Sequence, residues 1–121
     1  MKKKIKIICT LGPSSLNKKF LLFSNKNIEV LSFGTFNLEL DSDFANIDPE
    51  YLLETLIKLN TNGADALFIS CTALPALEII NEVEQKINKP VFSSNQTLIW
   101  DTIRSIGYKN AIEGYGQLFK K

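Results

Sequence analysis

The sequence predicts an α/β fold, a single domain of three layers with a four-stranded parallel sheet between helices. The chain has 121 residues, 45% of them hydrophobic, which is the size and apolar content of one compact domain. Short segments of strand type alternate with longer segments in which apolar residues recur at helical spacing. One short segment, residues 66–69, is apolar throughout, as expected of a strand covered on both faces at the centre of a sheet.

The first half of the chain predicts the order strand, helix, strand, loop and helix. Residues 5–9 are a short β-type run that ends in the turn residues 11–15, and a helix follows up to about residue 25. Residues 28–33 predict the second strand. Residues 34–47 show no period and carry acidic side chains, so we expect a solvated loop. Asp48, Pro49 and Glu50 then place a cap, a proline and an acid at the start of a helix that ends at Asn62 and Gly63.

The second half repeats this alternation around the apolar strand 66–69. We expect a third helix over residues 77–88, a fourth strand over residues 90–93, and a fourth helix that Ser94 and Asn95 cap and Gly107 ends. Alternating strands and helices favour parallel strands joined by right-handed crossovers, so residues 1–121 are predicted to form one Rossmann-like (flavodoxin-like) domain. The buried face of the fourth helix is expected to hold Leu98, Ile99, Ile103 and Ile106.

Composition excludes several classes of function. Fourteen Lys and Arg residues stand against 13 Asp and Glu, a net charge of +1, so nucleic acid is not an expected partner. The apolar stretch after the N-terminal lysines is too short for a signal peptide or a membrane span, and the two cysteines are expected to stay reduced in a cytoplasm. The chain has no histidine and no recognisable metal-ligand spacing, which excludes Ser-His-Asp and Cys-His mechanisms and leaves no expected metal site.

Cys71 is the candidate catalytic residue. It follows the central strand, and in parallel sheets functional groups gather at the carboxyl ends of the strands. Pro75 suits the first turn of the third helix, so we expect the Cys71 sulfur to face the amides that open this helix. Such a position lowers a thiol pKa and favours a nucleophile or proton donor. The alternative is an inert core residue, because cysteine is among the most buried residue types.

Several segments resemble the aspartate/glutamate racemase superfamily, especially its maleate isomerase and arylmalonate decarboxylase branches. Residues 64–74 look like the segment around the second catalytic cysteine of that superfamily. The resemblance covers about residues 28–118, since separate motifs occur in the family's order. These motifs are residues 33–37, 47–50, 77–80 with Glu84, 89–91, 93–96 with Trp100 and Arg104, and 114–118.

This resemblance implies a pseudo-symmetric enzyme of two α/β halves that acts without a cofactor on a small dicarboxylate or amino acid bound between them. Cys71 matches the cysteine of the second half. Ser70, Thr72, Ser94 and Asn95 lie in the matching segments and are the implied substrate-binding residues, although Ser94 and Asn95 can equally be no more than a helix cap. We expect only packing and surface roles for Leu98, Trp100 and Arg104. The family's first half has no counterpart in this sequence.

Residues 5–15 resemble the opening strand of pyruvate kinase. None of that enzyme's later arginine, lysine or acidic metal-binding motifs follows, so we infer no kinase chemistry. Gly12, Pro13, Ser14 and Ser15 form either a plain capped turn or an anion site at a helix N-terminus.

Two function classes remain open. The first is a half-domain of a racemase-type isomerase or decarboxylase, working with a complementary half or as a homo-oligomer. The second is a non-catalytic remnant or fusion product that binds a partner or a small carboxylate. Thiol chemistry at Cys71 separates the two, because only the first requires it.

Overall fold

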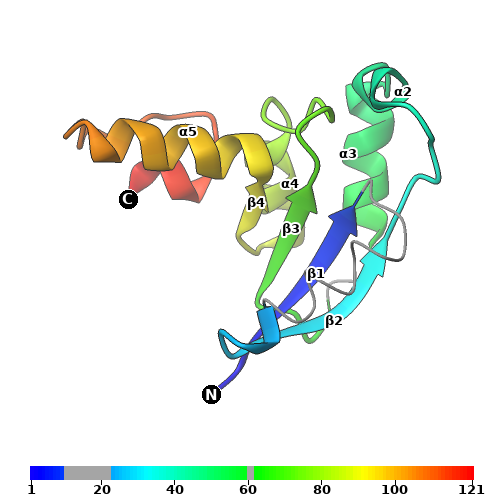
Figure 1. Ribbon diagram of the computed structural model, residues 1–121, viewed down its shortest axis with the longest axis horizontal. Coiled ribbons are helices and arrows are strands. Elements are labelled where there is room, and N and C mark those ends of the chain that lie inside the picture. The colour runs from blue at the N-terminus through cyan, green and yellow to red at the C-terminus, as the bar shows by residue number, and fades with distance from the viewer. Residues whose placement is uncertain (10–22, 60–61) are drawn as a thin grey trace.

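The computed structural model describes residues 1–9, 23–59 and 62–121 (Figure 1). The predicted turn at residues 11–15 and most of the predicted helix that follows it therefore lie outside the described residues. The described elements are β1 (Lys3–Cys9), β2 (Ile28–Gly34), α2 (Asp41–Ala45), α3 (Pro49–Lys58), β3 (Ala66–Ser70), α4 (Ile80–Ile87), β4 (Val91–Ser93), α5 (Ser94–Ser105) and the 3-10 helix η1 (Gln117–Lys120).

The four described strands form one parallel sheet in the order β2-β1-β3-β4. This confirms the predicted four-stranded parallel sheet, and β3 lies inside it, between β1 and β4. The physical reason is the apolar run in β3, in which Leu67 and Ile69 are fully buried on one face and Phe68 is half-buried on the other.

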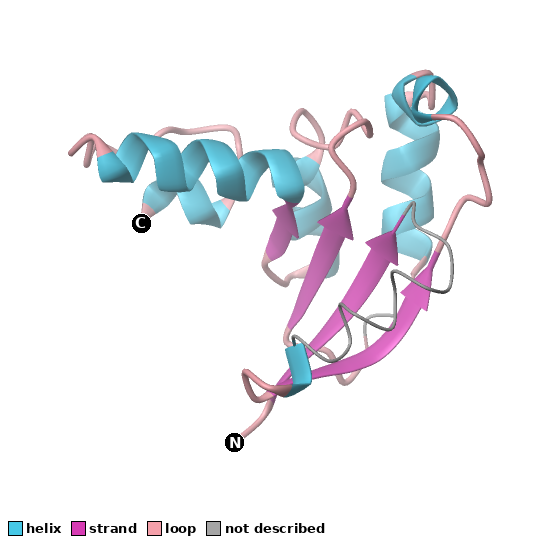
Figure 2. Cartoon of the chain, in the orientation of Figure 1, coloured by secondary structure: helices cyan, strands magenta, loops and turns pink. Residues whose placement is uncertain are grey.

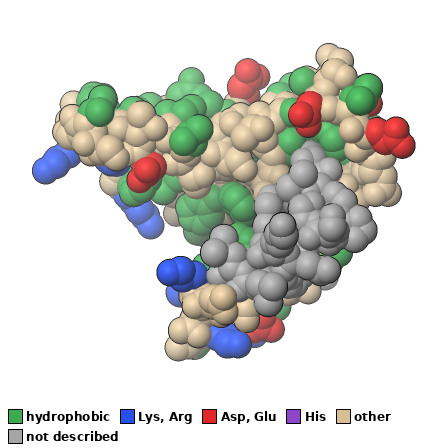
Figure 3. Space-filling model, in the orientation of Figure 1, with side chains coloured by type: hydrophobic (Ala, Val, Ile, Leu, Met, Phe, Trp, Pro, Cys, Tyr) green, Lys and Arg blue, Asp and Glu red, His purple; other side chains and the backbone are tan. Residues whose placement is uncertain are grey.

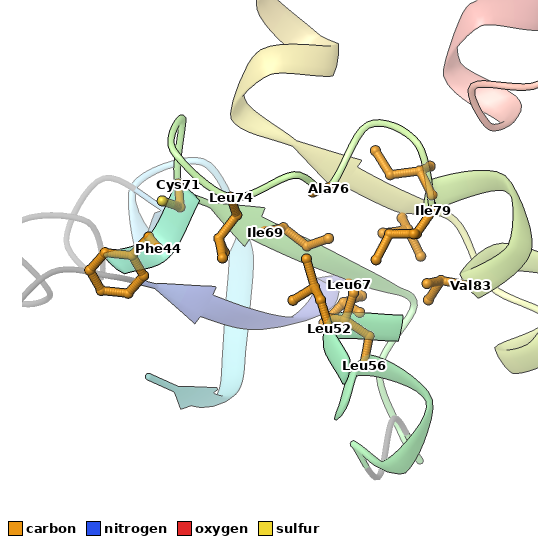
Figure 4. Packing of buried hydrophobic residues seen from close by; sticks show 12 residues of the cluster. Phe44, Leu52, Leu56, Leu67, Ile69, Cys71, Leu74, Ala76, Ile79 and Val83 are labelled. Carbon is orange, nitrogen blue, oxygen red and sulfur yellow. The ribbon is translucent and has the colours of Figure 1, made fainter. Parts of the chain in front are cut away.

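The core lies between the sheet and two helices. α3 and α4 cover the same face of the sheet (Figure 2), and the buried side chains of both helices belong to one cluster with the strand residues Leu67, Ile69 and Val91 (Figure 4). Each fully buried leucine or isoleucine there contributes about 1.5–3 kcal/mol relative to an exposed position. The helix residues of this cluster are Leu52, Leu56, Ile80 and Val83.

α3 begins as its sequence predicts. A side-chain oxygen of Asp48 accepts hydrogen bonds from the backbone N–H groups of Glu50 (2.8 Å) and Tyr51 (3.2 Å), and Pro49 opens the helix. Two of the N–H groups that a helix start leaves without an internal partner are satisfied in this way. This cap places the helix against the sheet with Leu52 and Leu56 facing inward.

Three local predictions were wrong. The region 34–47 is not only loop, because it contains α2, whose Phe44 is 2% exposed and packs into the core. The third helix begins at Ile80, after a turn in which Ile79 N–H bonds the Ala76 carbonyl (3.2 Å), and not at residue 77. Along α5, Ile103 is half-buried but Leu98 (65%), Ile99 (40%) and Ile106 (79%) are exposed.

The error along α5 arises because helical spacing identifies an apolar side of a helix but not the element that covers it. α5 packs against β4 and η1, and the buried side chain it contributes is Gln96. Among the described residues, no helix is long and apolar enough to cross a membrane.

Candidate active site

The residues implied by the sequence come together at the carboxyl ends of β3 and β4. These strands are adjacent and parallel, with Ile69 opposite Ser93, so the chain leaves both at the same edge of the sheet. Cys71 and Thr72 follow β3, and Ser94 and Asn95 form the first turn of α5. A hydrogen bond joins the two segments, from Asn95 Nδ2 to the Thr72 carbonyl oxygen at 2.9 Å.

Cys71 is a free, buried thiol. Its side chain is 7% exposed and belongs to the apolar core cluster, where Figure 4 shows it next to Leu74 and on the side of the cluster that holds Phe44. Ser70, which precedes it, is the last residue of β3 and is also buried. Thr72, the next residue, is exposed, so the chain passes from core to surface at this point.

The helix predicted to begin near Pro75, just after Cys71, begins further along the chain. Pro75 lies in an irregular segment, where Ala76 N–H bonds the Leu74 carbonyl at 2.8 Å, and α4 begins only at Ile80. The expectation that Cys71 faces the opening amides of this helix therefore loses its structural basis. Proline at a first helical position and proline in a turn look alike in sequence. The helix start tied to the Cys71 loop is that of α5, which has no acidic residue in its first turn.

The α5 cap also differs from the prediction. Ser93, not Ser94 or Asn95, is the N-cap: its hydroxyl oxygen accepts from Gln96 N–H (3.1 Å), and Gln96 Oε1 accepts from Ser93 N–H (3.3 Å). This is a capping box, and the Ser-x-x-Gln spacing could have revealed it. Because Ser93 caps the helix, the side chains of Ser94 and Asn95 are not needed for that purpose.

The sequence did not predict a set of buried polar hydrogen bonds that Glu84 of α4 and Gln96 of α5 make with the C-terminal segment and β4. Glu84 accepts two backbone hydrogen bonds, from Val91 N–H to Oε1 (2.9 Å) and from Gln117 N–H to Oε2 (2.8 Å). Gln96, 0% exposed, donates from Nε2 to the Tyr115 carbonyl (2.7 Å). These bonds connect the segment 115–117 to α4 and to the start of α5, and connect α4 to β4. The C-terminal segment therefore helps to hold β4 and α5, which carry half of the site, in place.

Arg104 and Trp100 have a packing role, as the sequence led us to expect. The Arg104 guanidinium lies 6.0 Å from the Trp100 ring centroid and donates to the carbonyls of Tyr108 (2.8 Å) and Lys121 (2.6 Å). The described residues contain no group of three or more Cys, Asp or Glu side chains that could hold a metal ion. The candidate anion turn at residues 12–15 lies outside the described residues.

The site thus offers a thiol, three hydroxyls and a carboxamide at one sheet edge. A thiol in this setting can act as a nucleophile or proton donor, and hydroxyl and amide groups can hold a carboxylate. A hydrogen bond joins Asn95 to Thr72, the residue that follows Cys71, and Ser70 and Ser94 lie in the same two segments.

Comparison with known proteins gives maleate isomerases and an arylmalonate decarboxylase among the relatives. The chain is 27% identical over 94 residues to a maleate isomerase of Alcaligenes faecalis, covering 77% of this chain and 37% of that protein. It is 25% identical over 117 residues to a maleate isomerase of Geobacillus stearothermophilus (96% and 47%), and 40% identical over 78 residues to an arylmalonate decarboxylase of Bordetella bronchiseptica (62% and 32%). The chain therefore spans less than half the length of these relatives.

Solved structures share the fold. The crystal structure of an arylmalonate decarboxylase matches with a TM-score of 0.85 at 21% identity, over 97% of this chain and 53% of that chain. A Nocardia farcinica maleate cis-trans isomerase, solved with a covalently bound succinylcysteine intermediate, matches with a TM-score of 0.86 at 16% identity, over 98% and 49%.

The family model described as arylmalonate decarboxylase matches residues 5–119, a range that includes the segment resembling the start of pyruvate kinase. Since this match covers nearly all of the sequence, the chain belongs to the arylmalonate decarboxylase family.

Proposed function

We propose that this chain is a half-domain, matching the C-terminal half, of a cofactor-independent racemase-type isomerase or decarboxylase that acts on a small dicarboxylate through the Cys71 thiolate. The observation that carries the proposal is the place of Cys71, directly after the interior strand β3 and joined through Thr72 to Asn95, in a chain of this family. The relatives include maleate isomerases and an arylmalonate decarboxylase, whose names describe reactions of small carboxylates.

The proposed roles follow from the chemistry of each group. In an isomerase, the Cys71 thiolate adds to one alkene carbon and the electron pair moves to the carbon next to the carboxylate; after rotation about the new single bond the thiolate leaves and the alkene re-forms. In a decarboxylase, loss of CO2 leaves an electron pair on the carbon next to the remaining carboxylate, and the Cys71 thiol protonates that carbon. Ser70, Thr72, Ser94 and Asn95 supply hydroxyl and amide hydrogen bonds to the substrate carboxylates. A reactive thiol needs a reducing compartment, so we propose a cytoplasmic location.

A partner completes the site in this proposal, either a complementary half or a second copy of the chain. The chain covers about half of each related structure, which supports a need for further residues. Apolar side chains are also exposed to solvent on α5 and in a recess next to it, and a partner could cover them (Figure 3). On the sheet face opposite α3 and α4, Ile5, Phe23, Ile28, Phe68, Phe92 and Thr97 line a hollow of about 250 Å³.

The second candidate function is a non-catalytic remnant or fusion product that binds a partner or a small carboxylate. The burial of Cys71 among Phe44 and Leu74 favours it, because an inert core thiol has the same surroundings. The two candidates differ in whether the sulfur is required for a reaction.

The test compares Cys71→Ser with Cys9→Ser, each assayed on maleate, aspartate, glutamate and an arylmalonate, with and without a candidate first-half partner. We expect Cys71→Ser to abolish turnover because a hydroxyl is a far poorer nucleophile and acid near neutrality, while Cys9→Ser retains it. Circular dichroism verifies that both variants fold. Turnover that survives Cys71→Ser would refute the enzyme proposal, and absence of turnover in every combination would favour the remnant.

A further inference from the structure

The short segment that carries Cys71 is anchored on both sides. On the N-terminal side, Ser70 belongs to β3 and pairs in register with Cys9 of β1, so the strand ladder fixes the backbone before Cys71. On the C-terminal side the ladder has ended, and Thr72 lies in an irregular stretch. Its carbonyl accepts the hydrogen bond from Asn95 Nδ2 at 2.9 Å.

Asn95 lies on an anchored part of the chain. It lies in the first turn of a 12-residue helix, next to Gln96, which is fully buried. Gln96 bonds the Ser93 backbone through its Oε1 and the Tyr115 carbonyl through its Nε2. The Asn95 amide therefore reaches the Cys71 loop from a helix start that Gln96 anchors, and anchored groups of this kind can hold a reactive side chain in place.

We propose that Asn95 is a positioning residue for Cys71: by holding the Thr72 carbonyl, it fixes the peptide that follows Cys71 and keeps the sulfur in one orientation at the sheet edge. This inference rests on the proposed function in taking Cys71 as the reacting group. It changes the role read from sequence, because an amide N–H of Asn95 is used within the protein. The Asn95 amide has a second N–H, and this donor can still serve a substrate carboxylate.

A positioning role and a substrate-binding role for Asn95 predict different effects on the thiol reactivity of the free protein and on kcat and KM. Without the Asn95 bond, the loop opens more often, so the buried sulfur reacts faster with a small reagent even when no substrate is present. The same loosening lowers kcat, because a group displaced by about 1 Å can lose roughly 100-fold in rate. A residue that only binds substrate would instead raise KM and leave the reactivity of the free protein unchanged.

The experiment measures alkylation of Cys71 by iodoacetamide in the full chain, across pH, with the Cys71 and Cys9 peptides quantified separately by mass spectrometry. In Asn95→Ala we expect the plateau rate at high pH to rise about fivefold, the change that loss of one typical neutral hydrogen bond makes in a local opening equilibrium. Asn95→Asp keeps the shape of the side chain but cannot donate once ionised, so its plateau rate should rise as well. The control is Asn110→Ala, an exposed asparagine beyond the other end of α5.

The alkylation rate does not depend on turnover, so this test stands even if no substrate is found. A plateau rate in both Asn95 variants equal to that of the parent chain would overturn the proposal. An equal rise in Asn110→Ala would overturn it too, because it would indicate general loosening. Thermal unfolding of each variant verifies that the protein is folded, and Asn95→Asp, which suits a helix N-terminus, serves if Asn95→Ala does not fold.

Discussion

Replacement of Gly116 by alanine tests how tightly the C-terminal segment packs beneath the site. Gly116 has a φ of +86°, in the left-handed region that other residues rarely adopt. A Cβ atom there would lie 2.6 Å from Ile80 Cγ2 and 3.0 Å from Gln96 Nε2. Both neighbours are fully buried, so neither can move away freely.

Two costs add in Gly116→Ala. The backbone at Gly116, with φ +86° and ψ 174°, lies in a region essentially restricted to glycine and costs another residue about 1–3 kcal/mol. Overpacking of a closed region costs roughly 1–3 kcal/mol. We therefore expect the free energy of unfolding to fall by about 2–6 kcal/mol, a large part of the roughly 5–15 kcal/mol available to a typical domain. The measurement is urea unfolding followed by the fluorescence of Trp100, the single tryptophan, whose indole N–H reaches the Lys121 carbonyl at 3.4 Å.

Gly107→Ala is the matched control. Gly107 also has a positive φ, +87°, but no described residue other than its two chain neighbours comes within 4 Å of the position that an alanine Cβ would take. It should therefore show only the backbone cost of about 1–2 kcal/mol. If Gly116→Ala were no more destabilising than Gly107→Ala, the C-terminal segment would not pack against Ile80 and Gln96 as described. The inference that this segment helps to hold β4 and α5 in place would then be refuted.

The remaining predictions concern the cap of α3 and self-association. Asp48→Ala should lower the free energy of unfolding by about 1 kcal/mol, because Glu50 N–H and Tyr51 N–H lose their acceptor. Asp101→Ala, at an exposed position within α5, should change it by less than about 0.5 kcal/mol, and equal effects in urea unfolding would contradict the capping role. The chain should self-associate in sedimentation, and Ile106→Glu, at a site that is 79% exposed, should weaken the association. A parent chain that stays monomeric up to high concentration would count against a homo-oligomer.

The sequence by itself determined the elements whose signals are local. The unbroken apolar run of residues 66–69 predicted the interior strand, because a short apolar run between turn residues is typical of a strand covered on both faces. Asp48 and Pro49 predicted the start of α3 for an equally local reason, since the cap satisfies N–H groups two and three residues away. The place of Cys71 directly after β3 followed from the same reading, and the motif order pointed to the family that the comparison then showed.

The tertiary structure alone decided which groups meet across the chain. Asn95 and Thr72 are 23 positions apart, and Glu84 and Gln117 are 33 apart, so no periodicity or spacing rule connects them. Nor could helical spacing show that α5 buries Gln96 and leaves Leu98 and Ile106 exposed, because burial depends on which element lies opposite. A buried polar side chain must find its partners wherever the fold brings them. The support of the Cys71 loop is therefore a property of the folded chain, and the local sequence around the cysteine does not contain it.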